Sequence, residues 1–225
     1  MSKSNPSKEE FEMVYSVSDP WGVNNSVPNI VRKQRLLQEL RHCRFQYGLD
    51  IGCGEGDLTN ALKVVNKFDA LDISEIAVRR AKESYPHINF FVADLKEISQ
   101  FSKDRYDFIC SFETLYYLSD ESERDKALME IKELGTANCV YCFSLVTVGE
   151  TEFRRYFRLD EAIALLQKHF NIINQFPISL QKLPLVARVL SRLCPALMVW
   201  PYQVRLRSTR PEKAYQNCFI AVRKS

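Results

Sequence analysis

The chain has 225 residues, of which 46% are hydrophobic and 26% are charged, and its formal net charge is +3. This length predicts one domain with a sizeable core. No apolar run reaches the roughly 18 residues that a membrane span needs, and no secretory signal follows Met1, so we expect a cytoplasmic protein. The seven cysteines are scattered and lie mostly in apolar runs, which is typical of reduced core residues and not of disulfides or a metal centre.

The charge is unevenly distributed along the chain. Up to Glu150 there are 18 basic and 24 acidic residues, whereas from Thr151 onward there are 13 basic and 4 acidic residues, so the two parts carry −6 and +9. A solvated basic face would explain the excess, and so would a surface that meets an anionic substrate or membrane. The second interpretation is favoured, because the excess coincides with an apolar segment.

The N-terminal region reads as a disordered tail followed by helices. Residues 1–10 are polar and rich in Ser, Lys and Glu, which is typical of disorder. Residues 11–44 predict one or two helices, interrupted at Asp19-Pro20-Trp21-Gly22 and resuming by Ile30. Trp21 would then be a turn residue, either a hydrophobic plug over the domain or part of a lid over a binding site.

Three of the seven glycines follow the first predicted strand. The strand covers 45–51, the glycines are Gly52, Gly54 and Gly56, and a helical pattern follows over 58–65. A strand that turns on glycines into a helix lets the backbone approach a ligand where a Cβ would collide. The sequence therefore predicts a ligand loop at this point.

Acidic residues end the next strands. The strand over 67–71 ends at Asp72, that over 88–93 ends at Asp94, and that over 106–111 leads into Glu113. An acid at the end of the second strand can accept both hydroxyls of an adenosine ribose. Asp94 is placed to accept a hydrogen bond from an adenine amino group.

The spacing of the glycine loop distinguishes between two adenosine cofactors. NAD sites have the pattern GxGxxG and a helix N-terminus that faces a pyrophosphate. Here the pattern is GxGxG, with Glu55 and Asp57 nearby and Asp50 just before it. An acidic loop repels phosphate and favours a cationic ligand that carries an ammonium and a sulfonium.

The rest of the chain continues the alternation of helices and strands. Ser74 is predicted to cap a helix over 75–84, and Ser119 to cap a helix that ends at Gly135. A fifth strand is expected over 138–145 and a helix over 159–170. Strands over 171–176 and 217–222 complete a seven-stranded sheet.

At these positions the chain resembles the class I S-adenosylmethionine-dependent methyltransferases. Two further stretches are similar to the nodulation N-methyltransferase branch, which acts on a glucosamine amine. The chain departs from the family before strand five, where a Pro-Gly-Gly turn is common and 134–138 reads Leu-Gly-Thr-Ala-Asn. The segments that carry the family resemblance are 50–56, 71–74, 92–95 and 111–115, and those similar to the branch are 19–22 and 115–118.

The resemblance implies an α/β fold with a Rossmann-like, seven-stranded, mostly parallel sheet and helices on both faces. The domain would cover 45–225, with an N-terminal helical lid over 11–44 and a helical insertion over 179–214 between strands six and seven. S-adenosylmethionine is the implied cofactor. Its expected contacts are Asp50, Gly52, Cys53, Gly54, Asp72, Ile73, Asp94, Leu95 and Ser111.

Methyl transfer from a sulfonium is an in-line displacement, so the protein must mainly hold the reacting atoms in line. Candidate catalytic residues at the end of strand four are Glu113, Tyr116 and Tyr117. Because adjacent tyrosines on a helix point to different faces, we expect at least one of the two in the core. The expected substrate-binding residues are Trp21, Arg155 and Arg158; the arginines can bind a carboxylate or phosphate.

The sequence predicts methyl transfer to an amine or hydroxyl of a small molecule, such as an amino sugar, a saccharide or a glycolipid-like acceptor. A nucleic acid is not expected, because methyltransferases of base amines carry Asn/Asp-Pro-Pro-Tyr/Phe after strand four and this chain has Ser-Phe-Glu-Thr over 111–114. Two alternatives stay open. The chain could bind the cofactor as a regulator without catalysis, or act on a protein or lipid at a membrane surface.

Residues 183–210 form an apolar and basic stretch. Pro184 suits a helix start and Pro195 a helix end, and Arg188 and Arg192 are four residues apart on an otherwise apolar pattern. A helix buried against the sheet or in a homodimer interface would explain it. So would a peripheral segment that contacts a membrane or a lipid-like substrate.

Overall fold

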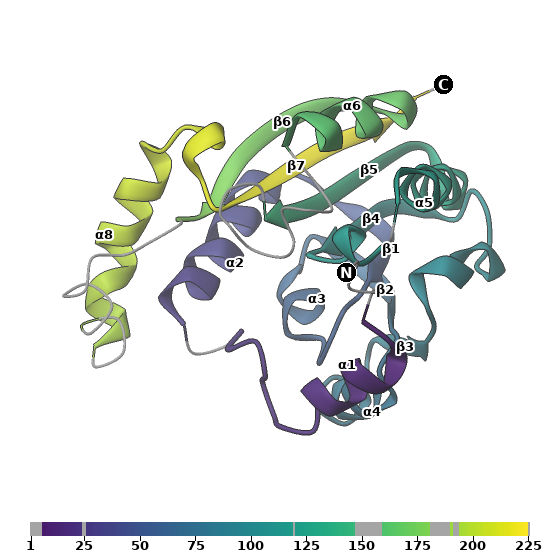
Figure 1. The fold of residues 1–225 in the computed structure, drawn as a ribbon, viewed down its shortest axis with the longest axis horizontal. Coiled ribbons are helices and arrows are strands. Elements are labelled where there is room, and N and C mark those ends of the chain that lie inside the picture. Colours follow the sequence, from purple (N-terminus) through teal and green to yellow (C-terminus); the bar gives the residue numbers. More distant parts are fainter. Residues whose placement is uncertain are drawn as a thin grey trace.

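The protein is described here from a computed structural model, which covers residues 6–23, 26–118, 120–146, 159–180, 190 and 194–224. Seven strands form one sheet in the order β3-β2-β1-β4-β5-β7-β6 (Figure 1). All strands of the sheet run in the same direction except β7, which is antiparallel to both of its neighbours, β5 and β6. The predicted mostly parallel α/β sheet is therefore confirmed. The strands are β1 Phe45–Ile51, β2 Val65–Asp72, β3 Asn89–Val92, β4 Tyr106–Phe112, β5 Gly135–Val146, β6 Phe170–Ser179 and β7 Gln216–Arg223.

Helices cover both faces of this sheet, as expected. One buried cluster joins the sheet to α5 and α6, and a second joins the opposite face to α2 and α4. In Figure 1, α1 lies beside α4 and α8 beside α2. The α-helices are α1 Lys8–Val14, α2 Val27–Leu40, α3 Asp57–Ala61, α4 Glu75–Ser84, α5 Glu121–Leu134, α6 Leu159–His169 and α8 Pro195–Arg207, and the 3₁₀ helices are η1 Leu95–Gln100, η2 Leu115–Tyr117 and η4 Pro211–Lys213.

Strand alternation divides the core between these two clusters. On β4, Phe108 and Cys110 belong to the cluster under α2 and α4, whereas Ile109 belongs to the cluster under α5 and α6. All three side chains are fully buried. Successive side chains of a strand point to opposite faces, so from Phe108 onward the even-numbered residues of β4 face one side of the sheet and the odd-numbered residues face the other.

The strand order creates a crevice beside β1. The chain runs outward from β1 to β2 and β3, then returns to place β4 on the other side of β1. The loops after β1 and β4 therefore leave the sheet in opposite directions at its carboxyl edge. Open α/β sheets bind their ligands at such a point.

The N-terminal region differs from the expected disordered tail over 1–10. Helix α1 begins at Lys8, because Ser7 and Glu10 form a capping box in which each side chain bonds the other residue's backbone amide. Helix α2 begins after Ser26, whose hydroxyl accepts from the Asn29 amide. The expected interruption between two helices around Pro20 is present.

Several helix ends differ from the sequence prediction. Helix α3 ends at Ala61, and Val65 already belongs to β2, so the helix expected over 58–65 is shorter. Ser74 caps α4 as predicted. Asp120 caps α5, and the predicted cap Ser119 lies outside the described residues.

The connection between β6 and β7 leaves and rejoins the sheet at the carboxyl edge, because β6 is antiparallel to β7 and β7 is antiparallel to β5. Pro195 begins α8, in agreement with the preference of proline for a first helical turn, and the helix that the sequence predicts before it lies mostly outside the described residues. None of the described helices is both long and apolar enough to cross a membrane.

Candidate active site

A cavity of about 510 Å³ opens at the carboxyl edge of the sheet. Eight of the nine predicted cofactor contacts line it, from Asp50 to Leu95. Trp21, Glu113, Tyr116 and Tyr117 line it as well. The predicted substrate residues Arg155 and Arg158 lie outside the described residues.

The glycine loop after β1 has a backbone that only glycine adopts easily. Gly52 and Gly54 have φ angles of +79° and +56°. A Cβ at Gly52 would lie 2.1 Å from Cγ2 of Thr114, and one at Gly54 would lie 2.8 Å from the Tyr15 hydroxyl. The loop can therefore follow the cavity wall only without side chains at these two positions.

Asp72, at the end of β2, holds this loop in place. Its Oδ2 accepts a hydrogen bond from the Gly54 amide at 2.8 Å, and its Oδ1 accepts one from the Ser74 amide at 3.0 Å. Burial raises the pKa of Asp72, and these two amides oppose that effect. Since each carboxylate oxygen can accept two hydrogen bonds, Asp72 can accept further donors from the cavity.

Asp50 is a buried acid on the cavity wall. Its Oδ2 accepts the Thr59 hydroxyl at 2.5 Å, whereas Oδ1 is buried and has no hydrogen-bond partner among the described residues. Burial raises the pKa of Asp50 to about 6, although the Thr59 hydroxyl opposes the rise. A buried, half-satisfied carboxylate on the cavity wall is the group that the ammonium of a cationic cofactor would neutralise.

Asp94 and Ser111, two further positions of the predicted cofactor set, have different surroundings. Asp94 lines the cavity and caps η1, with Oδ1 accepting the Lys96 amide at 2.9 Å. Ser111 is a correction. Its hydroxyl is fully buried 2.6 Å from that of Tyr141, and it does not line the cavity. Ser111 lies two residues after Ile109 on β4, so its side chain points to the same face of the sheet, the one covered by α5.

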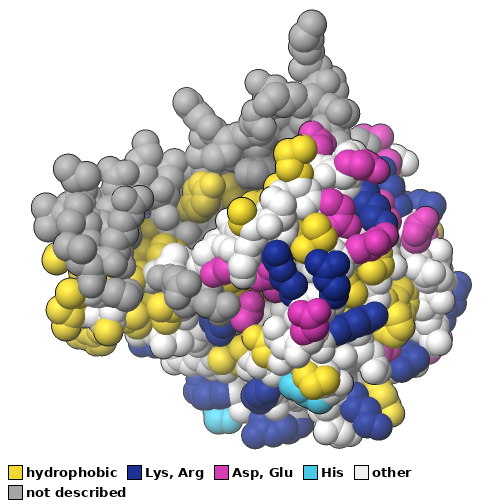
Figure 2. All heavy atoms as spheres, turned by 90° about the horizontal axis from the view of Figure 1, so that it is seen from below, with side chains coloured by type: hydrophobic (Ala, Val, Ile, Leu, Met, Phe, Trp, Pro, Cys, Tyr) yellow, Lys and Arg dark blue, Asp and Glu magenta, His cyan; other side chains and the backbone are white. Residues whose placement is uncertain are grey.

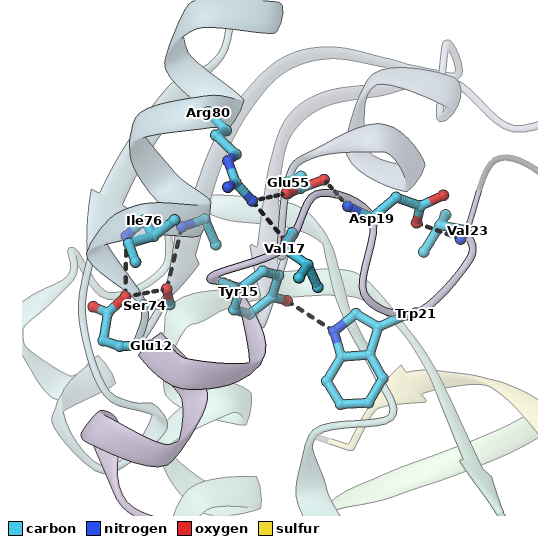
Figure 3. A network of polar contacts seen from close by, with 11 residues as sticks. Glu12, Tyr15, Val17, Asp19, Trp21, Val23, Glu55, Ser74, Ile76 and Arg80 are labelled. Carbon is cyan, nitrogen blue, oxygen red and sulfur yellow. Dashed lines mark hydrogen bonds and ion pairs between the residues drawn. The ribbon is translucent and has the colours of Figure 1, made fainter.

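The N-terminal region covers the cavity from one side. The Trp21 indole donates to the Tyr15 hydroxyl at 3.2 Å, and the two rings are nearly perpendicular (Figure 3). Both side chains line the cavity next to Gly54. The described part of the region expected to be a lid therefore contacts the predicted cofactor loop directly.

Two polar clusters attach this region to α4 (Figure 3). The Glu12 carboxylate accepts the Ser74 hydroxyl at 2.7 Å and the amides of Glu75 and Ile76 at 2.6 and 3.2 Å. Burial raises its pKa, but these donors outweigh burial and hold the pKa of Glu12 below its usual value. An acid from α1 therefore satisfies the free amides at the N-terminus of α4.

Arg80 forms the second attachment. Its Nη1 lies 2.7 Å from Oε1 of Glu55 and 2.9 Å from the carbonyl oxygen of Val17. The other oxygen of Glu55 accepts the Asp19 amide at 3.1 Å. Glu55, which the sequence placed in the acidic loop, lines the cavity and connects Arg80 of α4 to the covering region.

Glu113 occupies a strained position directly after β4. Its φ angle is +61°, which is rare for a residue with a side chain. The Ser144 hydroxyl donates to Oε1 at 2.6 Å, and the side chains of Tyr116 and Gln216 also hydrogen-bond the buried carboxylate. Burial raises the pKa of Glu113, and the positive charge of Arg32 opposes the rise.

Both candidate tyrosines reach the cavity. They lie in the single 3₁₀ turn η2, with ring centroids 4.7 Å apart, and Tyr116 is the more buried ring and also joins the α5-side core. Phe11 of α1 packs edge-on against Tyr117 at 5.0 Å. The expectation that one tyrosine enters the core holds for Tyr116, but its ring lines the cavity as well.

Several residues of the cavity wall were not predicted from the sequence, and four of them come from segments distant from the glycine loop. Tyr15 and Arg32 come from the N-terminal helical region, Tyr215 directly precedes β7, and Gln216 begins β7. No motif marks them, because each is placed by the packing of a distant segment. A weak indication exists in the sequence only for Arg32. It directly follows Val31, which is buried, on a helix whose apolar face must pack on the domain.

Comparison with known proteins agrees with this geometry. Residues 49–137 match a family model described as a methyltransferase domain. Nodulation protein S of Bradyrhizobium diazoefficiens is 27% identical over 129 residues, which cover 54% of this chain and 59% of that protein. Nodulation protein S of Rhizobium tropici is 29% identical over 118 residues, covering 50% and 49%. The chain thus matches only about half the length of these relatives.

A solved structure is similar over almost the whole chain. It is the N-methyltransferase NodS from Bradyrhizobium japonicum WM9 in complex with S-adenosyl-L-homocysteine, with a TM-score of 0.68 and 18% identity. The match covers 96% of this chain and 97% of that one. At this identity the likeness establishes the fold, including the elements outside residues 49–137.

Proposed function

We propose that the chain is a class I S-adenosylmethionine-dependent methyltransferase that transfers a methyl group to the amine of a small amino-sugar-like acceptor; the methyltransferase-domain match over residues 49–137 and the NodS-like fold support this. The observation that carries this proposal is the buried carboxylate of Glu113, which belongs to the cavity wall and is held there by neutral donors, with Arg32 as its positive neighbour. A buried carboxylate of this kind favours a cationic partner such as a substrate ammonium.

The cofactor would bind along the carboxyl ends of β1, β2 and β3. Asp72 would accept the ribose hydroxyls, Asp50 would face the ammonium, and Asp94 the adenine. The other proposed contacts are Gly52, Cys53, Gly54, Ile73 and Leu95, all of them on the cavity wall. When bound, S-adenosylmethionine supplies an electrophilic methyl group on a sulfonium.

The remaining wall would hold the acceptor. Glu113 would bind the acceptor ammonium and accept its proton before attack, while Ser144 holds Oε1 in place. Tyr116 and Tyr117 would line the path of the methyl group and exclude water, and Trp21 would close the cavity from the covering side. These roles mainly align the nucleophile, as an in-line displacement requires.

A hydroxyl acceptor is the alternative within the same fold. Glu113 would then act as a general base, which is a stronger demand because a hydroxyl is a weaker nucleophile than an amine. A saccharide or glycolipid-like acceptor would fit this chemistry. The NodS structure, described as that of an N-methyltransferase, supports the amine.

The test uses matched acceptors and a radioactive methyl label. Glucosamine, N-acetylglucosamine and methyl glucoside offer an amine, a blocked amine and hydroxyls only. We expect label in glucosamine or its oligomers and none in the other two. Label in all three would support a hydroxyl acceptor.

A separate measurement addresses the non-catalytic alternative. Calorimetry of S-adenosylmethionine binding is run on the same protein preparation. Cofactor binding without label in any acceptor, including a small-molecule extract, would favour a cofactor-binding regulator. Absence of binding would contradict the cofactor site itself.

A further inference from the structure

Helix α8 packs on α2 through one face only. Tyr202 and Leu206 of α8 are buried against Val27 and Val31 of α2. The Tyr202 hydroxyl also accepts a hydrogen bond from the backbone amide of Leu180, directly after β6, at 2.9 Å. This packing fixes the rotation of α8 and therefore decides which side chains face outward.

The outward face of α8 is a stripe of large apolar side chains. Leu197, Trp200 and Val204 are 73%, 72% and 50% exposed. Their spacings of three and four residues place them on one side of the helix. In Figure 2, hydrophobic side chains gather at the left of the molecule, where Figure 1 places α8. Exposed apolar patches of this kind are typical of interaction sites.

Positive charge surrounds this stripe. Arg205 and Arg207 are exposed and, at about 100° per residue, lie on opposite sides of the stripe; Nη2 of Arg207 also donates to Oε1 of Gln38 on α2 at 2.7 Å. Arg210 is exposed just after the helix. The sequence has no acidic residue between Glu161 and Glu212. The surface is therefore apolar along its centre and positive along its borders.

The stripe belongs to the side of the molecule that carries the cavity. The insertion leaves β6 after Ser179 and returns at Gln216, both at the carboxyl edge of the sheet. Tyr215, directly before β7, and Gln216, which begins β7, line the cavity. A surface that bound α8 would therefore lie near the cavity and not behind the sheet.

We propose that α8 docks this protein on an anionic lipid surface. Trp200, Leu197 and Val204 insert among the lipid head groups, and the flanking arginines contact anionic phosphates. The helix lies in the interface and does not span it, since it has 13 residues and one face is buried on α2. This inference rests on the fold and does not depend on the acceptor.

The charge pattern favours lipid over a second copy of the chain. A twofold contact through α8 would bring the same surface of two copies together. Arg205 and Arg207 of each copy would then meet arginines of the other, with no carboxylate on α8 to offset them. An anionic membrane supplies the missing negative charge along the whole border.

Co-sedimentation with vesicles tests the proposal. We expect the full chain to bind phosphatidylcholine vesicles that contain phosphatidylglycerol, to lose binding as salt increases, and not to bind phosphatidylcholine alone. Leu197→Ser/Trp200→Ser and Arg205→Glu/Arg210→Glu should each weaken partitioning by roughly tenfold or more. The matched controls are Met129→Ser and Lys126→Glu on α5, which replace exposed residues of the same kinds and should bind like the parent.

Fluorescence provides a second readout that is independent of sedimentation. The chain has two tryptophans, so Trp21→Phe leaves Trp200 as the only one. We expect its emission to shift to shorter wavelength with anionic vesicles. An unchanged spectrum and no binding at low salt would overturn the proposal. So would a concentration-dependent dimer that Trp200→Ser abolishes, because α8 would then be covered by a second copy.

Discussion

The two halves of the cavity are built in different ways. The proposed cofactor half consists of loops after β1, β2 and β3, all within residues 50–95, and its shape depends largely on backbone groups. The proposed acceptor half is assembled from side chains of distant segments, such as Trp21, Arg32, Glu113 and Gln216. Recognition of a shared cofactor is thus local in the sequence, whereas recognition of a particular acceptor depends on tertiary packing.

The largest expected effect is a loss of turnover when the acceptor half of the cavity is changed. Glu113→Gln keeps the shape of the side chain but removes its charge, so turnover should fall by roughly 10²–10⁴ while cofactor affinity stays unchanged. Steady-state kinetics and calorimetry measure the two quantities. Glu121→Gln, an exposed change on α5, is the control. Turnover near the parental value would leave Glu113 a structural residue.

The next effect addresses the backbone of the cofactor half. Gly54→Val places a side chain where a Cβ already lies 2.8 Å from the Tyr15 hydroxyl, at a φ angle of +56°. We expect cofactor binding to become undetectable while circular dichroism shows a retained fold. Gly22→Val is the matched control, since Gly22 also has a positive φ angle but no atom within 4 Å of a Cβ.

Comparable cofactor affinities in these two glycine variants would contradict the loop assignment. The comparison separates backbone strain, which both variants share, from collision at the cavity wall. A lower melting temperature is expected for both variants. Only Gly54→Val should lose the cofactor.

Asp72→Ala tests the two roles of one carboxylate. The change removes the bonds to the Gly54 and Ser74 amides together with the proposed ribose acceptors, and should cost about 1–3 kcal/mol of cofactor binding. Asp69→Ala is the control, because Asp69 is also buried on β2 but does not line the cavity. It should lower the free energy of unfolding without changing cofactor affinity. Equal affinities in both variants would exclude Asp72 as a ribose acceptor.

The smallest expected effect is a pH dependence at Asp50. Its pKa of about 6 lies above the ordinary aspartate value, so the free energy of unfolding of the cofactor-free protein should rise as pH falls from about 6 to 4. Cofactor affinity should change in the opposite direction, by about tenfold per pH unit below 6, because the ammonium requires an ionised carboxylate. Calorimetry at several pH values measures the affinity. Asp50→Asn should remove this dependence, and a parental dependence in that variant would assign it to another group.

The cofactor half could be predicted from the sequence because it depends on short-range patterns. A strand, a glycine loop and a terminal acid follow one another within about 20 residues, and all nine predicted cofactor contacts except Ser111 line the cavity. Ser111 was predicted as a contact because it adjoins the motif after β4. Its position two residues after Ile109 already assigns its side chain to the face of the sheet covered by α5. The start of α1 was readable too, since Ser7 and Glu10 have the spacing of a capping box.

The acceptor half could be predicted only in part. Trp21 and Glu113 stand next to recognisable breaks in the pattern, a Pro-Gly turn and a strand end. Tyr15 and Arg32 have no such marker, because their positions depend on how α1 and α2 pack on the domain. The attachment of Glu12 to α4 joins residues more than 60 positions apart, which no local pattern reveals.

The β6–β7 connection has a consequence for how such proteins diversify. Its two ends are fixed by pairing between β6 and β7, whereas the residues between Ser179 and Gln216 add no strand to the sheet in their described part. Segments of different length and composition can therefore replace one another here without changing the β1 loop. Exchange of a single contiguous segment would give a descendant a new surface and a new wall beside the cavity while the inherited cofactor site stays intact.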